Sequence, residues 1–543
     1  MKHAVLLFFF LLGLCTYSQK DNTSNLSSPG DISKMSRAKQ KLYAGDYRSA
    51  LNLYIELEKN NPNNSTVKYY MAYCQFHLSQ IPTAKENLNK AIELNKDLKP
   101  ETHLLLAEVL QTEGDFNAAL SQLDIFSEKT RAMKMDEEKK EEATYVRSQC
   151  QSGKDLTAKP LDVEIKNMGA GINSKWDDKN PCITADGSKL VFTTRRPETT
   201  NSERDVEGDG GYYENIYIVQ RDSATGDLLQ AQAAGGAINS LAHDACTSIS
   251  ADGKQIFIYK NDASRAESRG GNVFVSKIKN DKWGAPASLG KPINTSYWEG
   301  GVCMSPDGKR YFFSSERKGG FGRSDIWMVE KINKNEWSKP MNLGSEVNSA
   351  YDEAGMFLAP DGKTLFFCSN GPKSMGSYDI FKTVYENGTW SVPENLGYPI
   401  NTSAKEGQIT LSADARTAYF SSDRKGGYGE NDIYKTDLRS ISLLEKAGQP
   451  KENNGLSIVK GTIREGYEGY GMAETEIVMT HIGNGQVNST LTNESGEYFF
   501  TLPAGQYKLE VKKKGYTTIT EQLELPQNAK ETPVIEKGFL LKK

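Results

Sequence analysis

Five acidic residues recur at equivalent places in the middle of the chain and are the side chains best spaced to act together. Each lies five positions after the asparagine of a repeated Asn-Ser or Asn-Thr pair, and the five are Asp178, Asp244, Glu299, Glu353 and Glu406. If the repeats form a ring, these positions surround one mouth of its central channel. Charges of one sign in such a concave site attract a cation or a basic segment. The spacing therefore makes this channel-mouth acidic ring a candidate binding site.

Two other interpretations of the same carboxylates stay open. Each could accept hydrogen bonds from backbone N–H groups between the repeats, and five equal caps would look the same in the sequence. Alternatively, the channel could bind or hydrolyse a glycan. Hydrolysis needs one carboxylic acid and one base in different environments, which five equivalent positions do not supply.

A second candidate is a pair of similar glycine-rich segments, residues 314–322 and 421–429. They carry basic and aromatic residues that could contact a partner or a sugar polymer, namely Arg317, Phe321, Arg424 and Tyr428. The simpler interpretation is that both are hairpin connections whose glycines permit positive φ.

Other chemistry is not indicated, and we expect no catalytic residue, cofactor or metal site. The chain has no Gly-x-Ser-x-Gly elbow, phosphate-binding loop or His-Glu-x-x-His motif. Residues 205–210 resemble the start of a calcium loop, but Ile216 stands where the twelfth ligand must be Glu, which favours a solvated loop. The histidines beyond the leader fall in three different domains: His77, His103, His243 and His481.

The cysteines give no sign of a disulfide framework or a zinc site. Beyond Cys15 they are scattered without a Cys-x-x-Cys pair, and we expect them to be small buried apolar residues: Cys74, Cys150, Cys182, Cys246, Cys303 and Cys368.

The elements that carry the five acids are short strands in units of about 53 to 66 residues. An Asp-Gly pair recurs at 186, 252, 307 and 361, with a degenerate Asp-Ala at 414, each between two alternating apolar runs. This is the signal of a β-hairpin. Units of four short strands indicate propeller blades, since one such sheet cannot bury both faces alone. We predict a β-propeller over residues 161–440 with five blades in preference to six, closed by a first strand near Leu161 that completes the last blade.

The segment before the propeller has a helical repeat. Ala50, Ala84 and Ala119 are spaced 34 and 35 residues apart, close to the 34-residue period of tetratricopeptide repeats. We predict an all-α solenoid over residues 31–150, whose groove binds peptides or protein partners.

Both ends of the chain are distinct from these repeats. Residues 1–18 read as a signal peptide, with an 11-residue apolar core and cleavage before Gln19. Lipidation of Cys15 is an alternative, because residues 12–15 resemble a lipobox with Leu14 at an unfavourable place. After a polar linker, residues 441–455, short strands with turns predict a small β-sandwich over residues 456–543.

Length and charge agree with this multidomain organisation. The chain has 543 residues, too many for one small fold, and a net charge of −4, which leaves no basic excess for a phosphate backbone. Nucleic acid is therefore not an expected partner. No later apolar run is long enough to span a membrane, so we expect membrane attachment only through a lipid on Cys15 or through partners.

The motifs of the three domains resemble known families. The five repeats resemble the WD40-like, TolB-type propeller, and residues 456–543 resemble the carboxypeptidase regulatory-like domain. The order of domains resembles the PorE-type envelope proteins of Bacteroidota, which are associated with type IX secretion and gliding. That family also has a C-terminal OmpA-like domain that grips peptidoglycan; the present chain does not show it, so the resemblance does not carry peptidoglycan contact over.

The resemblance implies a non-enzymatic periplasmic scaffold, associated with the outer membrane, that binds envelope proteins through the helical groove and the propeller faces. The alternative is a carbohydrate-binding or glycan-hydrolysing protein that acts through the propeller channel.

Overall fold

The computed structural model describes most of the chain, in two compact units, residues 1–158 and 159–543. The described residues are 26, 28–131, 136–197, 203–205, 210–222, 225–261, 271–279, 282–333, 336–441, 443–444, 456–466, 469–527 and 532–543. Cys15, the leader and most of the predicted linker lie outside them.

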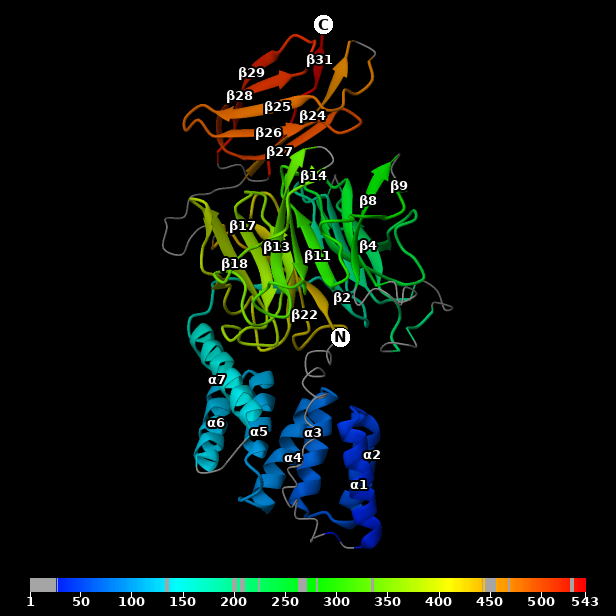
Figure 1. Cartoon of the computed structure of the whole chain (residues 1–543), viewed down its shortest axis with the longest axis vertical. Coiled ribbons are helices and arrows are strands. Elements are labelled where there is room, and N and C mark those ends of the chain that lie inside the picture. The colour runs from blue at the N-terminus through cyan, green and yellow to red at the C-terminus, as the bar shows by residue number, and fades with distance from the viewer. Residues whose placement is uncertain are drawn as a thin grey trace. The chain divides into compact units, whose positions relative to one another are not determined.

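Within its described residues, the first unit consists of seven helices that pack in sequence order (Figure 1). They are α1 (Pro29–Tyr43), α2 (Tyr47–Asn60), α3 (Ser65–His77), α4 (Ile81–Leu94), α5 (Glu101–Glu113), α6 (Phe116–Thr130) and α7 (Glu137–Thr157). These helix pairs resemble tetratricopeptide repeats, as predicted, although α7 continues beyond residue 150. None of the described helices is long and apolar enough to cross a membrane.

The repeated small residues bring the paired helices together. Ala50, Ala84 and Ala119 lie on α2, α4 and α6, and each is fully buried. Two of these helices, α2 and α6, begin in the same way: Asp46 and Asp115 accept hydrogen bonds from Ser49 N and Ala118 N, which satisfies an N–H group that the helix itself cannot. The Gly-Asp pairs at residues 45–46 and 114–115 are therefore helix starts.

The second unit begins with five antiparallel sheets, each built mainly from consecutive strands (Figure 1). The first sheet contains β2 (Asp178–Ile183), β3 (Lys189–Thr194), β4 (Asn215–Gln220) and β5 (Gln232–Ala233). The second contains β6 (His243–Ile249), β7 (Gln255–Asn261), β8 (Asn272–Lys279), β9 (Lys282–Trp283) and β10 (Ala287–Ser288). The third contains β11 (Glu299–Met304), β12 (Arg310–Ser315), β13 (Asp325–Asn333), β14 (Glu336–Trp337) and β15 (Met341–Asn342).

The last two sheets follow the same order, and the fifth is completed by a strand from the start of the unit. The fourth contains β16 (Glu353–Leu358), β17 (Thr364–Ser369), β18 (Asp379–Glu386), β19 (Thr389–Trp390) and β20 (Glu394–Asn395). The fifth contains β21 (Glu406–Leu411), β22 (Thr417–Ser422), β23 (Asp432–Asp437) and β1 (Ile165–Asn167). As predicted, the strand near the start pairs with the last one, with Ile165 opposite Thr436.

Hydrophobic cores lie between neighbouring sheets. One contains Val191 of β3 with Ile256 and Ile258 of β7, and another contains Phe192 of β3 with Ile433 of β23. All five residues are fully buried. The first strands of the sheets contact one another in the cyclic order β2, β6, β11, β16, β21 and back to β2. Each sheet is thus covered on both faces by its neighbours.

Two further sheets form the end of the chain. One contains β24 (Leu456–Glu465), β27 (Glu497–Pro503), β30 (Val534–Glu536) and β31 (Phe539–Leu541); the other contains β25 (Glu476–His481), β26 (Val487–Leu491), β28 (Gly505–Lys512) and β29 (Ile519–Leu525). Their core includes Val459, Ile477, Leu509 and Val511, all at most 1% exposed. The small β-rich domain predicted here is present.

Candidate functional site

The five acids of the candidate ring, which we call the capping acids, are buried and accept hydrogen bonds inside their own repeats. Their exposed fractions are 0% or 1%. Each accepts from the backbone N–H and the hydroxyl of the residue four positions earlier: Ser174, Ser240, Thr295, Ser349 and Thr402. These are the bonds of the capping interpretation. The expectation of five carboxylates facing an open channel mouth is corrected, because their oxygens are used within the loops that carry them.

Four of the capping acids also have a cation. Arg196 lies 2.7 Å from Asp178, Lys260 lies 2.6 Å from Asp244, and the other two pairs are Arg317 with Glu299 at 3.3 Å and Arg424 with Glu406 at 3.1 Å. In the part of the chain that the structure describes, Glu353 has no such partner. Burial raises the pKa of Glu353, which is hydrogen-bonded to Ser349 and Ser369. Burial also raises the pKa of Glu406, although Arg424 opposes the shift.

The asparagine that opens each repeat links two sheets. Its side chain accepts from the N–H and donates to the C=O of one residue on the third strand of the preceding sheet. The pairs are Asn173 with Ile433, Asn239 with Ile216, Asn294 with Val273, Asn348 with Ile326 and Asn401 with Ile380. The first of these pairs joins the first sheet to the fifth. The linking asparagines therefore connect the five sheets in the same cyclic order as the contacts between their first strands.

In the two glycine-rich segments, the arginines form hydrogen bonds within the protein, and the aromatic residues are exposed to solvent. Arg317 donates to the carbonyls of Pro292 and Ile293, and Arg424 makes the equivalent bonds to Pro399 and Ile400. Both guanidinium groups therefore point into the protein rather than to a partner. The rings of Phe321 and Tyr428 are 53% and 54% exposed.

The backbone of these segments fits the hairpin interpretation. Gly319 and Gly426 have φ of 95° and 91°, which favours glycine. The following turn is held by Asp325, which accepts from the N–H groups of Phe321 and Gly322 at 2.7 and 2.9 Å.

The residues directly before the capping acids, which we call the mouth positions, are of four different types in the five repeats. They are Asp177, His243, Trp298, Asp352 and Lys405. We did not identify them from the sequence, although a signal was present: each adjoins a repeated marker, yet the five positions include acidic, basic, aromatic and histidine side chains. A position that the fold kept uniform would not vary in this way.

Two mouth positions belong to one charged network. The Lys179 ammonium lies 2.7 Å from Asp177 and 2.6 Å from Glu214, and the His243 ring bridges Glu214 and Asp205, with both nitrogen–oxygen distances 3.2 Å. Burial alone would raise the pKa of both Asp177 and Glu214, but Lys179, together with Asn431 at Asp177 and His243 at Glu214, lowers both. Burial would lower the pKa of His243, yet Glu214 and Asp205 raise it.

The helical unit gathers its own set of polar and aromatic side chains. Burial raises the pKa of Tyr73 on α3, and the charges of Glu108 on α5 and Glu142 on α7 add to the shift. Burial and the charge of Glu142 likewise raise the pKa of Glu108. Tyr73 also packs against His77, with ring centroids 4.5 Å apart. α5 contacts both α3 and α7, and on these helices Glu108 and Glu142 are near enough to Tyr73 to raise its pKa; we call this the common face of α3, α5 and α7.

The other candidate residues do not come together. His77, His103, His243 and His481 have separate partners: Tyr47, Gln122, Glu214 and Tyr507. The six described cysteines are buried and free. A search of the described residues finds no group of three or more His, Cys, Asp or Glu placed to hold a metal ion.

Comparison with known proteins identifies the last domain. Residues 458–536 match the family model of the carboxypeptidase regulatory-like domain. The C-terminal module is such a domain.

Other comparisons concern smaller parts of the chain. It is 29% identical over 150 residues to the Sol locus transcriptional repressor of Clostridium acetobutylicum, which aligns 27% of this chain with 47% of that protein. The chain thus spans about half the length of this curated relative.

Two solved structures are similar to about a quarter of the chain. The type III secretion chaperone SycD of Yersinia enterocolitica, in complex with a peptide of the translocator YopD, has 18% identity and a TM-score of 0.22 and covers 24% of this chain and 97% of its own. The TPR2B domain of yeast Sti1, in a complex with pHsp70, has 19% identity and a TM-score of 0.21 and covers 23% of this chain and 98% of its own.

The carboxypeptidase regulatory-like domain contacts the Asp-Gly end of the five sheets. Ala185 N donates to Ala251 O, Ala413 N donates to Ala185 O, and Leu456 N of β24 donates to Ala413 O. Leu456 and Ile458 form one buried cluster with these alanines. The domain therefore covers the ends of the first strands, opposite to the capping acids at their beginnings.

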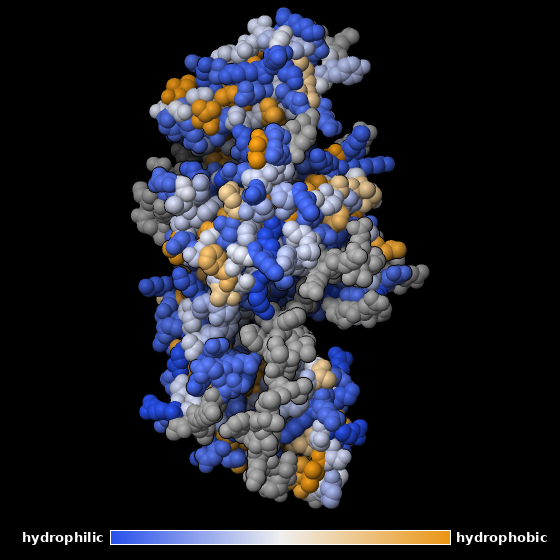
Figure 2. Space-filling model, viewed as in Figure 1, coloured by the Kyte–Doolittle hydropathy of each residue, from blue (hydrophilic) through white to orange (hydrophobic). Residues whose placement is uncertain are grey.

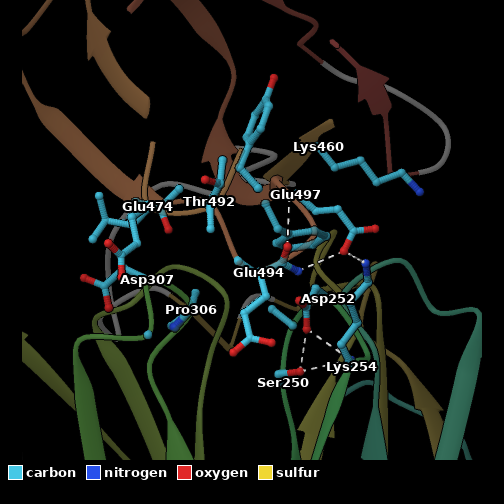
Figure 3. Close-up of a pocket in the computed structure, with 18 of the residues that line it drawn as sticks. Ser250, Asp252, Lys254, Pro306, Asp307, Lys460, Glu474, Thr492, Glu494 and Glu497 are labelled. Carbon is cyan, nitrogen blue, oxygen red and sulfur yellow. Dashed lines mark hydrogen bonds and ion pairs between the residues drawn. The ribbon is translucent and has the colours of Figure 1, made fainter. Parts of the chain in front are cut away.

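Beside this contact lies a hollow of about 1460 Å³ between the Asp-Gly turns and the regulatory-like domain (Figure 3). Its lining mixes acidic and basic side chains, among them Asp252, Asp307, Glu494 and Lys460. Figure 3 shows Lys254 and Glu497 pointing toward one another, and they form an ion pair across the hollow. Such a balanced lining is typical of a contact between two domains rather than of a ligand pocket.

Proposed function

We propose that this protein is a non-enzymatic scaffold that binds protein partners in the cell envelope. Its five sheets are the blades of a closed WD40-like, TolB-type propeller, the helical unit is a tetratricopeptide solenoid, and the regulatory-like domain covers one end of the propeller. The cyclic contacts of the inner strands and the five linking asparagines support the closed propeller.

The observation that carries the binding role is the common face of α3, α5 and α7. Tyr73, Glu108 and Glu142 come from α3, α5 and α7, and the two carboxylates raise the pKa of Tyr73. A row of aromatic and acidic side chains along an array of helices suits an extended polypeptide, since aromatic residues contribute contact area and carboxylates select basic groups. We propose that this face binds a segment of a protein partner.

The surface is consistent with a protein that makes several separate contacts. On the face that Figure 2 shows, the hydrophobic residues of the described parts form small groups among hydrophilic ones. Discrete contacts of this kind suit a scaffold better than a single large apolar interface.

The proposal is tested by capture of partners on the tagged full-length protein from its native envelope after crosslinking. Glu142→Lys should deplete the captured proteins at least tenfold, because it reverses a charge on the common face. Glu86→Lys is the matched control, since Glu86 is exposed on α4. Capture that is the same for both variants, or that survives deletion of residues 29–157, would contradict the proposal.

We further propose a periplasmic location associated with the outer membrane, and a link to type IX secretion or gliding. The signal-peptide pattern of residues 1–18 supports export. The intact mass of the mature N-terminus decides between cleavage before Gln19 and lipidation of Cys15. A mass that retains residue 1 would contradict export.

A channel that hydrolyses a glycan is the less supported function. The carboxylates first considered for it, the capping acids, use their oxygens in buried hydrogen bonds within the loops.

A further inference from the structure

The mouth positions have the same backbone role in every repeat in which their loop is described, so only their side chains differ. A residue that follows the second strand donates its N–H to the carbonyl of the mouth position. The bonds are Arg195 to Asp177, Glu316 to Trp298, Asn370 to Asp352 and Asp423 to Lys405. A uniform backbone with changing side chains indicates that the fold does not select these side chains.

Lys405 is the mouth position whose positive charge has no ion-pair partner among the described residues. Its ammonium lies 5.3 Å from the centroid of the Tyr378 ring. No carboxylate lies at ion-pair distance from it within the described ranges, whereas Lys179 is paired twice. The side chain is partly buried, and burial together with the nearby Lys179 lowers its pKa. Partial burial of a cation without a counter-ion is costly unless a ligand supplies the charge.

The nearby carboxylates are already engaged elsewhere. Asp177 binds Lys179 and accepts from Asn431 at 2.6 Å. Asp423 accepts the backbone N–H of Lys405 at 2.8 Å. Asp352 binds Arg323 at 2.6 Å and accepts from the Tyr378 hydroxyl at 3.3 Å. None of these acids reaches the Lys405 ammonium, although Asp177 and Asp423 lie near enough to oppose the fall of its pKa.

The site lies at the end of the propeller that the regulatory-like domain does not contact. Lys405 precedes the start of β21, while Ala413, beyond the end of the same strand, bonds to Leu456. A strand of six residues is about 20 Å long, so the two places are well separated. The regulatory-like domain therefore does not supply the missing anion.

We propose that Lys405 anchors a carboxylate-binding subsite at the mouth of the propeller and that the carboxylate belongs to a protein partner. This inference rests on the proposed scaffold function and names the chemistry that one of its faces recognises. A polyanion fits poorly, because Asp177 and Asp352 flank the subsite and repel further negative charge. A single carboxylate, from an acidic side chain or a chain terminus, satisfies Lys405 and leaves these acids for neighbouring N–H or cationic groups of the same partner.

Three short peptides provide the probes for the test, used with the purified full-length protein. One is Gly-Gly-Glu-Gly-Gly with both ends blocked, which offers a side-chain carboxylate. The second is Gly-Gly-Gln-Gly-Gly with a free C-terminus only, and the third is the same Gln peptide with both ends blocked. The lysines are first dimethylated with ¹³C, which keeps their charge, and the Lys405 signal is assigned by its loss in Lys405→Met.

We expect at least one carboxylate peptide to shift the Lys405 signal with a saturable curve and to raise its pKa, while the blocked Gln peptide does not. Lys405→Met should weaken that binding at least tenfold, and Lys425→Met, an exposed lysine of a nearby loop, should not. Stronger binding of the first peptide would identify the ligand as a side-chain carboxylate, and stronger binding of the second would identify it as a chain terminus. Equal behaviour of all three peptides, or no saturation up to about 10 mM, overturns the proposal.

Failure of this test is distinct from failure of the scaffold function. The peptide titration needs no cellular partner and concerns only the propeller mouth, whereas the capture experiment uses variants of the helical unit. If no peptide binds but Glu142→Lys still captures fewer partner proteins, the proposed subsite is wrong and the scaffold function remains supported.

Discussion

The two ends of the five-sheet region differ in what their residues are used for. At the Asp-Gly end the same turn recurs, and the regulatory-like domain packs onto it through Leu456 and Ile458. At the other end, a capping acid is present in every repeat, but the mouth position before it varies, as His243 before Asp244 and Lys405 before Glu406 show.

This difference separates residues that build the fold from residues available for recognition. A repeated architecture needs the same cap in each copy, because each loop has the same N–H groups to satisfy. It makes no such demand on the residue before the cap, and we propose that variety there marks the end that distinguishes partners. The following substitutions test that separation.

Arg424→Met should have the largest effect, a loss of about 3 kcal/mol in the free energy of unfolding, because it leaves Glu406 buried without its cation. Urea unfolding followed by tyrosine and tryptophan fluorescence measures it. Lys425→Met, one residue further and exposed, should stay within about 0.5 kcal/mol of wild type. Equal losses would show that the capping acids do not need these cations.

Asn401→Ala should cost about 2 kcal/mol, since it removes the partners of both backbone groups of Ile380 in a site that is 0% exposed. Asn239→Ala makes the equivalent change at a partly exposed position, where water can replace the lost bonds, and should cost about 1 kcal/mol. The comparison uses the denaturation midpoints of the two variants. The reverse order would contradict burial as the reason that the links stabilise the sheets.

Thr501→Val addresses the Asp-Gly end and should cost about 1 kcal/mol. The Thr501 hydroxyl donates to Pro360 O at 2.8 Å, which joins the regulatory-like domain to the fourth sheet. Thr520→Val, the same change at an exposed site of β29, controls for the altered side chain. Thermal unfolding by calorimetry is the measurement, and identical traces for the two variants would argue against this contact.

His243 should give the smallest effect, under about 1 kcal/mol, and one that depends on pH. Burial lowers its pKa, but Glu214 and Asp205 raise it above the ordinary 6.5. The stability from these pairs is therefore complete below pH 6.5 and is lost as the pH rises through the folded-state value. His243→Gln should be less stable than wild type at pH 5.5 and nearly equal to it at pH 9; a difference that grows with pH would be inconsistent with these pairs.

Much of the architecture was predictable from the sequence, because residues of the same type recur at the spacing of the structural repeat. Ala50, Ala84 and Ala119 are spaced by one helical repeat and are buried, since only small residues allow the helices so close. The capping acids were also found by spacing. The sequence left their role open, because a carboxylate that caps a loop and one that binds a ligand would be the same residue type at the same spacing along the chain.

Arg317 shows why the contacts of the candidate site could not all be predicted from the sequence. In a segment rich in glycine it looks like a solvated residue, yet its guanidinium reaches the carbonyls of residues 292 and 293. That contact depends on how the loop folds back, which no local pattern encodes. The mouth positions pose the opposite difficulty, because repetition reveals the residues that the repeats share and these residues vary.

The sequence by itself determined the order of the modules, the number of repeats and the places of their caps, because each follows from local spacing that recurs. The tertiary structure decided which charges meet. The Lys179 ammonium forms ion pairs with Asp177 and with Glu214, which lies directly before β4 of the same sheet. Lys405 lies over an aromatic ring and near Lys179, and no carboxylate of the described residues is at ion-pair distance from it. Electrostatic pairing depends on distance in space and on burial, and both are set only when the sheets come together.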